Sequence, residues 1–261
     1  MVLLSLAMAV TAASLLLSVV AWEWMVAWTR EDRLFEWSQV AVLIAIVVLL
    51  VGAGWRRTRG PHRQKWLGVA LLLGALAFFF AAGEEISWGQ RILGLQTPEQ
   101  LAEINTQEEL SLHNVQGVKG TIETWMGRGI ALFALVGTVA LMARRPRVQA
   151  LWLPSAAVVL ALVLTVGFRN YEQPYKSAIA VHVCGVAVAA VFAWRREWVW
   201  LGAALGVVVL SGLATAASVT FITPTDTHVL NETRELLELT AGLIYAVELH
   251  ADRARPTATP Q

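Results

Sequence analysis

The sequence predicts an all-α protein, a polytopic bundle of about eight transmembrane helices, and three observations support this. Of the 261 residues, 57% are hydrophobic and only 15% are charged, whereas soluble domains have about 45–50% apolar and about 25% charged residues. The apolar residues form blocks long enough for helices of roughly 20 residues, which is what crossing the hydrocarbon core requires. Tryptophans stand at the ends of many blocks, and their amphipathic rings favour the membrane interface.

Eight apolar runs are the candidate spans. The fourth and eighth are short and would need tilt or flanking residues to cross the membrane. The first run lacks the basic segment that begins a signal peptide, so we expect it to stay as a span. Its removal would leave seven spans in the same orientation. The runs cover residues 3–28, 37–55, 66–87, 129–142, 151–168, 177–194, 198–222 and 236–249.

Charge alternates from loop to loop. Four loops or ends, near residues 56–65, 144–147, 195–196 and 253–255, place 12 of the 20 basic residues on one side. By the positive-inside rule this side is cytoplasmic, and both termini lie there. Sixteen of the 19 acidic residues fall on the other side, so the net charges are +9 inside and −8 outside. Because Asp and Glu contribute little to topology, the acidic outer side indicates a function of its own.

The chain is predicted to form a single domain. Residues 1–255 make the transmembrane domain, with an outer loop or lid at 94–128, and residues 256–261 make a disordered tail. No internal repeat is visible, which disfavours inverted-repeat transporters. The single cysteine, Cys184, excludes an internal disulfide and a multi-cysteine metal site. The expected partners are membrane lipids, including a lipid-linked substrate, and no nucleic acid.

The most informative segment is AAGEEISWGQRILGLQTPEQ, residues 81–100, where an apolar span leads directly into Glu84 and Glu85. An ionised carboxylate at membrane depth costs about 2.5–3.5 kcal/mol on insertion scales, so it usually faces the bundle interior or a wet cavity. On a continuing helix, Glu84, Trp88 and Arg91 would share one face. A structural ion pair between Glu84 and Arg91 is the alternative to a functional role.

The segment that follows predicts a cover over these helix ends. Thr97 and Pro98 are typical of a helix start, with Thr97 as the N-cap, which predicts an interfacial helix over residues 98–110. His113 and Asn114 would then hang near the mouth of the site. A lone surface histidine often has no function, but the acidic neighbourhood favours one.

Polar side chains from other spans fall on the same side. Glu36 begins the second span, Arg169 follows the fifth, and Glu235 and Glu238 enter the eighth. Glu235 has a structural alternative as a carboxylate near a positive helix N-terminus, whereas Glu238 lies inside the apolar run. The predicted catalytic residues are Glu84, Glu85, His113 and Asn114. The predicted substrate-binding residues are Arg91, Trp88, Gln90, Glu36, Arg169, Glu235 and Glu238. The candidate metal ligands are Glu84, Glu85, His113 and Glu238.

Three chemistries suit this set of side chains. Carboxylates with a histidine can bind a divalent metal that activates water or holds a phosphate. Neighbouring carboxylates can divide acid and base roles, because like charges push their proton affinities apart. Carboxylates inside a membrane can also relay protons or cations. The sequence contains no HExxH, GxSxG or phosphate-binding glycine loop.

The string GEEISWGQRILG, continuing to TPE and then to NTQEELSLHN, resembles a recurrent pattern in uncharacterised bacterial multi-pass membrane proteins. Those proteins are similar also in an acidic segment before the second span, here Glu31, Asp32 and Glu36. The resemblance implies a bacterial inner-membrane location. It also implies that one functional unit contains Glu84, Glu85, Ser87, Trp88, Gln90, Arg91, His113 and Asn114.

These observations favour an enzyme that hydrolyses or transfers a group on a lipid or lipid-linked substrate at the outer leaflet. Glu84 and Glu85 would act as acid and base or as metal ligands, and Arg91 would bind an anionic group. The alternatives are a cation- or proton-coupled transporter or channel, and a non-catalytic assembly subunit. Transport needs polar residues on the cytoplasmic side too. The inner halves of the fourth, fifth and seventh spans are almost wholly apolar, which favours the enzyme.

Overall fold

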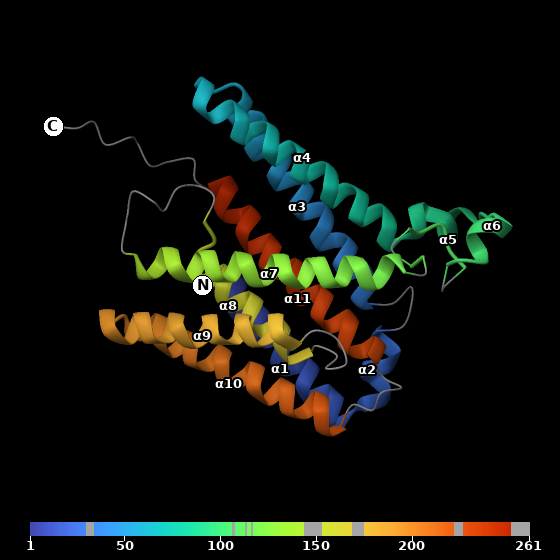
Figure 1. The fold of residues 1–261 in the computed structure, drawn as a ribbon. Helices are drawn as coiled ribbons and strands as arrows, with labels where there is room; N and C mark the ends of the chain where they lie inside the picture. Colours follow the sequence, from blue (N-terminus) through green and yellow to red (C-terminus); the bar gives the residue numbers. More distant parts are fainter. Residues whose placement is uncertain are drawn as a thin grey trace.

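The protein is an all-α helical bundle, as the sequence predicts. The computed structural model describes residues 1–29, 34–105, 108–112, 114–115, 117–143, 153–168, 175–221 and 227–251. Within these ranges nearly every residue is helical (Figure 1), and β pairing is limited to one isolated bridge between Asn105 and Val115.

The long helices run the length of the bundle, and the short ones gather at one end (Figure 1). In chain order the elements are α1 (Val2–Val20), α2 (Trp22–Thr29), α3 (Leu34–Thr58), α4 (His62–Glu85), η1 (Ser87–Gly89), α5 (Gln90–Leu93), α6 (Glu99–Ala102), α7 (Val118–Met142), α8 (Ala156–Thr165), η2 (Val166–Phe168), α9 (Tyr175–Arg195), α10 (Trp198–Phe221) and α11 (Thr227–Ala251).

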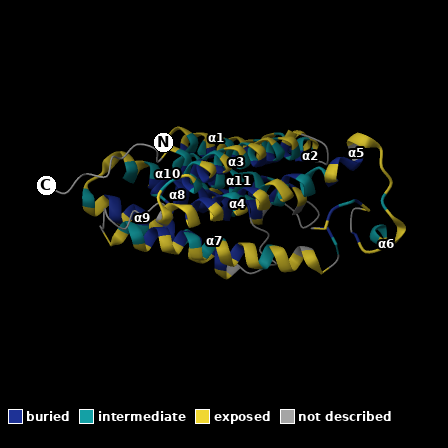
Figure 2. Cartoon of the chain, turned by 90° about the horizontal axis from the view of Figure 1, so that it is seen from above, coloured by how far each residue is buried: buried dark blue, intermediate teal, exposed yellow. Residues whose placement is uncertain are grey.

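Six helices in the described part of the chain are long and apolar enough to cross a membrane, namely α1, α3, α4, α7, α9 and α10. Large apolar side chains on these helices are exposed, and Figure 2 shows the exposed residues on their outward faces and the buried ones inside. Exposed apolar surface of this extent fits lipid and not water. The chain is therefore a multi-pass membrane protein.

Four predicted spans differ from the observed helices. The last of them, predicted over residues 236–249, is the longer helix α11, which begins at Thr227 and is not among the six apolar helices. The first run breaks at Ala21, whose backbone is not helical, so α2 is a separate helix. The fourth predicted span corresponds to α7, which begins at Val118 after Gly117, well before the predicted start at residue 129. Its first turns carry charged residues, which hydropathy does not count as part of a span. The loop before it therefore ends earlier than the predicted boundary at 128.

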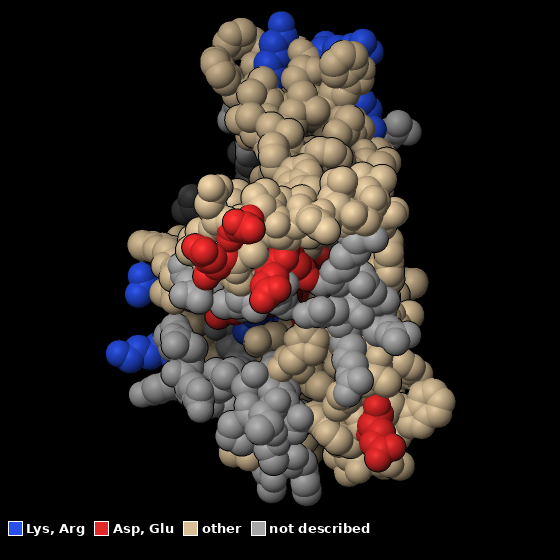
Figure 3. Space-filling view, turned by 90° about the vertical axis from the view of Figure 1, so that its right-hand side faces the viewer, with Lys and Arg blue, Asp and Glu red and all other residues tan. Residues whose placement is uncertain are grey.

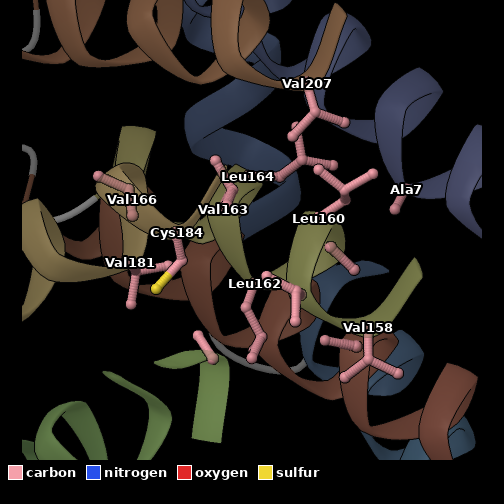
Figure 4. Close-up of a cluster of buried hydrophobic side chains, with 14 of the residues drawn as sticks. Ala7, Val158, Leu160, Leu162, Val163, Leu164, Val166, Val181, Cys184 and Val207 are labelled. Carbon is pink, nitrogen blue, oxygen red and sulfur yellow. The ribbon is translucent and has the colours of Figure 1, made fainter. Parts of the chain in front are cut away.

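The predicted fifth span is the third difference, because α8 is a short helix that is buried along its whole length. Ten helical residues extend about 15 Å, half of the roughly 30 Å hydrocarbon core. Figure 4 shows Leu160, Leu162 and Leu164 of α8 among side chains of its neighbours, such as Val181 of α9 and Val207 of α10. α8 is therefore the centre of the apolar core, with no face left for lipid.

α11 joins the two parts of the bundle. α3 and α4 form an antiparallel hairpin, and α11 packs against α3 on one side and α8 on the other. The hairpin is tight because a Cβ on Gly68 would lie 2.8 Å from the carbonyl oxygen of Gly54, and small residues allow helices in membranes to approach this closely. At the far end Arg57 donates to the carbonyl oxygen of Leu249 at 2.9 Å, which satisfies the α11 C-terminus.

Candidate functional site

The candidate site lies at one end of the bundle, which we call the acidic end. α2, the loop after α4, and the first turns of α3, α7 and α11 meet there (Figure 1). Figure 3 looks at this end and shows Asp and Glu side chains gathered near its centre, with Lys and Arg at the margins. The uneven distribution of charge along the sequence therefore corresponds to a real concentration of acid at one end of the fold.

The chain reverses sharply after Glu85. Ser87, Trp88 and Gly89 have φ values of 46°, 55° and 77°, a left-handed conformation that is unusual for a serine or a tryptophan. The prediction that Glu84, Trp88 and Arg91 share one continuous helical face is therefore wrong. Instead the Trp88 ring folds back over Gly83, where a Cβ would lie 2.8 Å from the ring.

Glu84 holds this reversed chain in place. One carboxylate oxygen, Oε1, accepts a hydrogen bond of 2.7 Å from the Trp88 indole nitrogen. The other, Oε2, accepts one of 2.6 Å from the backbone nitrogen of Leu112. Both oxygens of this predicted catalytic residue are thus engaged in fixing the loop.

Two neighbours of Glu84 bind the same loop. The Ser87 hydroxyl donates to Glu109 Oε2 at 2.5 Å. Gln90 accepts from the Leu110 backbone nitrogen at 2.6 Å and donates to Thr97 Oγ1 at 2.5 Å. We call Glu84, Ser87, Trp88 and Gln90 the loop staple. Four residues of the GEEISWGQRI segment thus hold the loop against the end of α4.

The loop itself is less helical than predicted. α6 ends at Ala102 and does not continue to residue 110. Thr97 is not the N-cap, because the cap position is Pro98 and the Thr97 hydroxyl donates to the Glu108 carbonyl at 2.6 Å. Asn114 is buried and donates to Ser111 Oγ at 3.2 Å, which gives it a place in the loop's own packing.

Glu85 has a different environment from Glu84. It is half-buried at the end of α4, and four other carboxylates lie close enough to act on it electrostatically. They come from α3, α4 and α11. We call this group the carboxylate cluster, and its members are Glu85, Glu36, Glu84, Glu232 and Glu235. The structure thus brings four predicted site residues together, namely Glu36, Glu84, Glu85 and Glu235.

Arg234 lies beside the cluster and was not expected from the sequence. It is 9% exposed and lies 3.1 Å from Glu235, 3.7 Å from Glu238 and 4.0 Å from Glu123 of α7. Glu238 therefore forms an ion pair at the edge of the cluster. The ion pair could have been predicted from the sequence, because Arg234 and Glu238 are four residues apart and such pairs share one face of a helix.

Gln39 and His228 were also missed. Gln39 is fully buried and donates to Glu232 twice, to Oε2 at 2.9 Å and to the carbonyl oxygen at 3.2 Å. His228 Nε2 donates to the Thr29 carbonyl at 2.6 Å, and its Nδ1 lies 3.7 Å from Glu232 Oε1. Glu232 thus contacts Gln39 of α3 and His228 of its own helix, α11.

The remaining predicted residues give a mixed outcome. His113 and Arg169 lie outside the described residues, as does the side chain of Arg91. Among the residues that the structure describes, no three His, Cys, Asp or Glu side chains are arranged to hold a metal ion. The metal candidates Glu84, Glu85 and Glu238 therefore do not form such a group by themselves.

Comparisons with protein-family models, with curated proteins and with solved structures find no match to this chain. Its function is therefore inferred from the chemistry of its own side chains.

Proposed function

We propose that the protein is a membrane enzyme that uses Glu85 for acid–base chemistry on a lipid or lipid-linked substrate at the extracytoplasmic face. The observation that supports this proposal is the position of Glu85. It ends an apolar helix, it is half-buried, and carboxylates from three helices act on it.

The cluster supports a division of acid and base roles. Carboxylates held close together cannot all be ionised cheaply, so one keeps a proton while another stays charged. Glu235 is 3.1 Å from Arg234, so its carboxylate has a positively charged neighbour. Glu85 has no basic partner among the described residues. We therefore assign Glu85 as the proton donor and Glu235 as the base.

The location supports a lipid substrate. The cluster lies at the ends of helices whose outer surfaces are apolar, and such a position fits the depth of lipid headgroups. The loop staple holds residues 108–112 against the end of α4, so the substrate would meet the cluster beside a fixed cover. By the positive-inside rule, the basic loops at the other end of the bundle support an extracytoplasmic location for the acidic end.

A conversion assay tests the proposal. Purified protein is incubated with total bacterial membrane lipids, and mass spectrometry identifies any lipid that is consumed. Glu85→Gln should slow that conversion by about 10²–10⁴-fold, the usual contribution of a general acid or base. Glu99→Gln, the same change at an exposed carboxylate of α6, is the control and should retain the rate. A folded Glu85→Gln protein with full activity would exclude the assigned role.

A proton- or cation-coupled transporter is the second candidate, and one observation favours it. Polar side chains continue along α11 past the cluster, because Tyr245 and Glu248 follow Glu238 towards the basic end, where Glu248 accepts a 2.5 Å hydrogen bond from Ser155. Carboxylates in such a row can relay protons. Reconstituted protein that acidifies liposomes in response to a pH gradient, and loses this with Glu238→Gln, would favour transport over catalysis.

A further inference from the structure

The turn between α3 and α4 lies at the end of the bundle away from the carboxylate cluster, and it is strongly basic. Residues 56–65 contain four arginines and one lysine, and no Asp or Glu occurs anywhere between residues 37 and 83. In Figure 1 the tip of this hairpin extends beyond the end of α11. The turn is therefore a positively charged surface that the proposed chemistry does not use.

Two of the arginines belong to the packing of the bundle. Arg56 donates to the carbonyl oxygen of His250 at 3.0 Å, and Arg57, which is buried, donates to that of Leu249 at 2.9 Å. These guanidinium groups hold the last turn of α11, where a positive charge is favourable. They are therefore not counted among the charges that a ligand could meet.

Arg59 and Lys65 are exposed, and no carboxylate in the described part of the chain forms an ion pair with either of them. The backbone holds them close along the chain, because α3 ends at Thr58 and α4 begins at His62. The backbone nitrogen of Gly60 donates to the Arg57 carbonyl at 3.1 Å, which closes the turn. Two accessible positive charges thus stand on one short, ordered turn.

Trp55 holds the Arg59 side chain in position. The guanidinium carbon of Arg59 lies 4.3 Å from the centre of the Trp55 ring, within the range of a cation–π contact. This contact restrains a long side chain without using a hydrogen-bond acceptor. The guanidinium can therefore bind a ligand with a smaller loss of side-chain freedom than an unrestrained arginine.

The tryptophans also indicate the depth of these charges in the membrane. Trp55 is 53% exposed near the end of α3, and Trp66 is 71% exposed near the start of α4. Exposed tryptophan rings favour the membrane interface. Arg59 follows Trp55 by four residues and Lys65 precedes Trp66 directly, so both cations lie at the level of lipid headgroups. We call Trp55, Arg59, Lys65 and Trp66 the basic tip.

We propose that the basic tip binds the headgroup of an anionic phospholipid. The guanidinium of Arg59 can donate two N–H groups to two phosphate oxygens, and Lys65 adds a compact positive charge. A phospholipid fits better than a soluble phosphate, because the exposed rings of Trp55 and Trp66 supply apolar contact for its acyl chains. A zwitterionic lipid carries its own cation, so its net attraction to two positive charges is weaker. This binding does not depend on the proposed enzyme.

Native mass spectrometry tests the proposal. The full chain is purified in nanodiscs of equal parts phosphatidylglycerol and phosphatidylcholine with identical acyl chains, and the lipids that stay bound are identified. The wild type should retain phosphatidylglycerol in preference. Arg59→Gln and Lys65→Gln should each lower this preference about fivefold, the contribution of one basic residue near an anionic membrane surface. Both leaflets of a nanodisc have one composition, so the orientation adopted in the cell does not affect the result.

Arg128 of α7 provides a matched control. It is exposed, and its guanidinium carbon lies 4.9 Å from the centre of the Trp125 ring, so it forms the same kind of pair away from the α3–α4 turn. Arg128→Gln removes one positive charge and should keep the preference. An equal loss in Arg128→Gln and Arg59→Gln would show that bound lipid follows total charge, and it would overturn the basic tip as a binding site.

Inorganic phosphate distinguishes a lipid from a soluble ligand. Bound phosphatidylglycerol that remains in millimolar inorganic phosphate supports the lipid assignment, whereas its displacement would show that the phosphate group alone is recognised and would overturn that assignment. Equal retention of both lipids by the wild type would also overturn the proposal. Glu85→Gln does not change the basic tip, so the failure of this proposal and the failure of the proposed enzyme are observed separately.

Discussion

Adjacent glutamates at the end of α4 have separate roles because they lie on different sides of the helix. Both Glu84 oxygens accept hydrogen bonds from the reversed chain, one from an indole and one from a backbone amide. Glu85 faces α3 and α11 and lies within the carboxylate cluster. The two side chains are chemically identical, so the side of α4 from which each one projects decides what it contacts.

Gln90 provides a test of the loop staple. Gln90→Leu removes the acceptor of the Leu110 backbone nitrogen and the donor to Thr97, and it should destabilise the loop by about 1–3 kcal/mol because buried polar groups lose their partners. Hydrogen exchange at the Leu110 amide should become faster. Gln96→Leu, at an exposed position of the same loop, should leave the exchange rate unchanged. Equal rates in the Gln90 variant and the wild type would show that the staple does not order the loop.

At the scale of elements, α11 makes polar contacts with α3 at both of its ends. Gln39 binds it from α3 at the acidic end, and Arg56 and Arg57 bind its last carbonyls at the basic end. α11 therefore keeps the α3–α4 hairpin in register with the apolar core. A shift of this helix would move Glu232 and Glu235 relative to Glu85, so the packing of α11 sets the geometry of the cluster.

The hairpin that α11 holds depends on one close approach. A Cβ on Gly68 would lie 2.6 Å from the Thr58 backbone nitrogen, whereas a Cβ on Gly74 would meet only Leu50 at an ordinary 3.8 Å. Gly68→Ala should therefore lower the thermal midpoint in detergent, at a cost of about 1–3 kcal/mol for overpacking. Gly74→Ala should be neutral or slightly stabilising, because alanine favours the helix. An equal midpoint for the two variants would show that the hairpin can open without cost.

Across the described part of the molecule, acidic side chains gather at the acidic end (Figure 3), whereas Arg56, Arg57 and Arg59 lie at the far end of the α3–α4 hairpin. The exposed tryptophans follow the same division, since Trp37 and Trp88 lie towards the acidic end while Trp55, Trp66, Trp194 and Trp198 lie towards the other. Such a pattern is typical of two interfacial belts. It is the arrangement expected of a bundle whose axis lies along the membrane normal.

Cysteine labelling tests the orientation. In a Cys184→Ala background, Gln96→Cys in the loop and Arg59→Cys between α3 and α4 are both exposed. A membrane-impermeant maleimide applied to intact cells should label the first and spare the second, because the positive-inside rule keeps the α3–α4 turn in the cytoplasm. Permeabilised cells should label both. The opposite labelling pattern would place the acidic end inside and contradict the proposed extracytoplasmic site.

The helices were predictable because each is encoded by a local run of residues. The predicted runs 37–55, 66–87, 177–194 and 198–222 lie close to α3, α4, α9 and α10. The start of α7 was not predictable from hydropathy, because its first turns carry Lys119 and Glu123. The interruption of the first helix at Ala21 was also not predictable, because no proline or glycine marks it.

The candidate site was predictable only in its outline. That acidic side chains collect at one end follows from their place in the chain and from the cost of leaving charge at membrane depth. Which side chains meet depends on how α3, α4 and α11 pack. Gln39 is an ordinary glutamine in an apolar run until α11 places Glu232 against it.

The order of apolar and charged segments along the chain is enough to establish a membrane bundle with opposite charges at its two ends, because burial in lipid depends on composition and length. The contacts that join Gln39 to Glu232 and Arg57 to Leu249 connect residues 193 and 192 positions apart in the chain, and no local pattern carries that information. The separate environments of Glu84, which anchors the loop, and Glu85, which belongs to the carboxylate cluster, were likewise not predictable from the local sequence. They arise from the left-handed turn at Ser87 and Trp88 and from the position of α11.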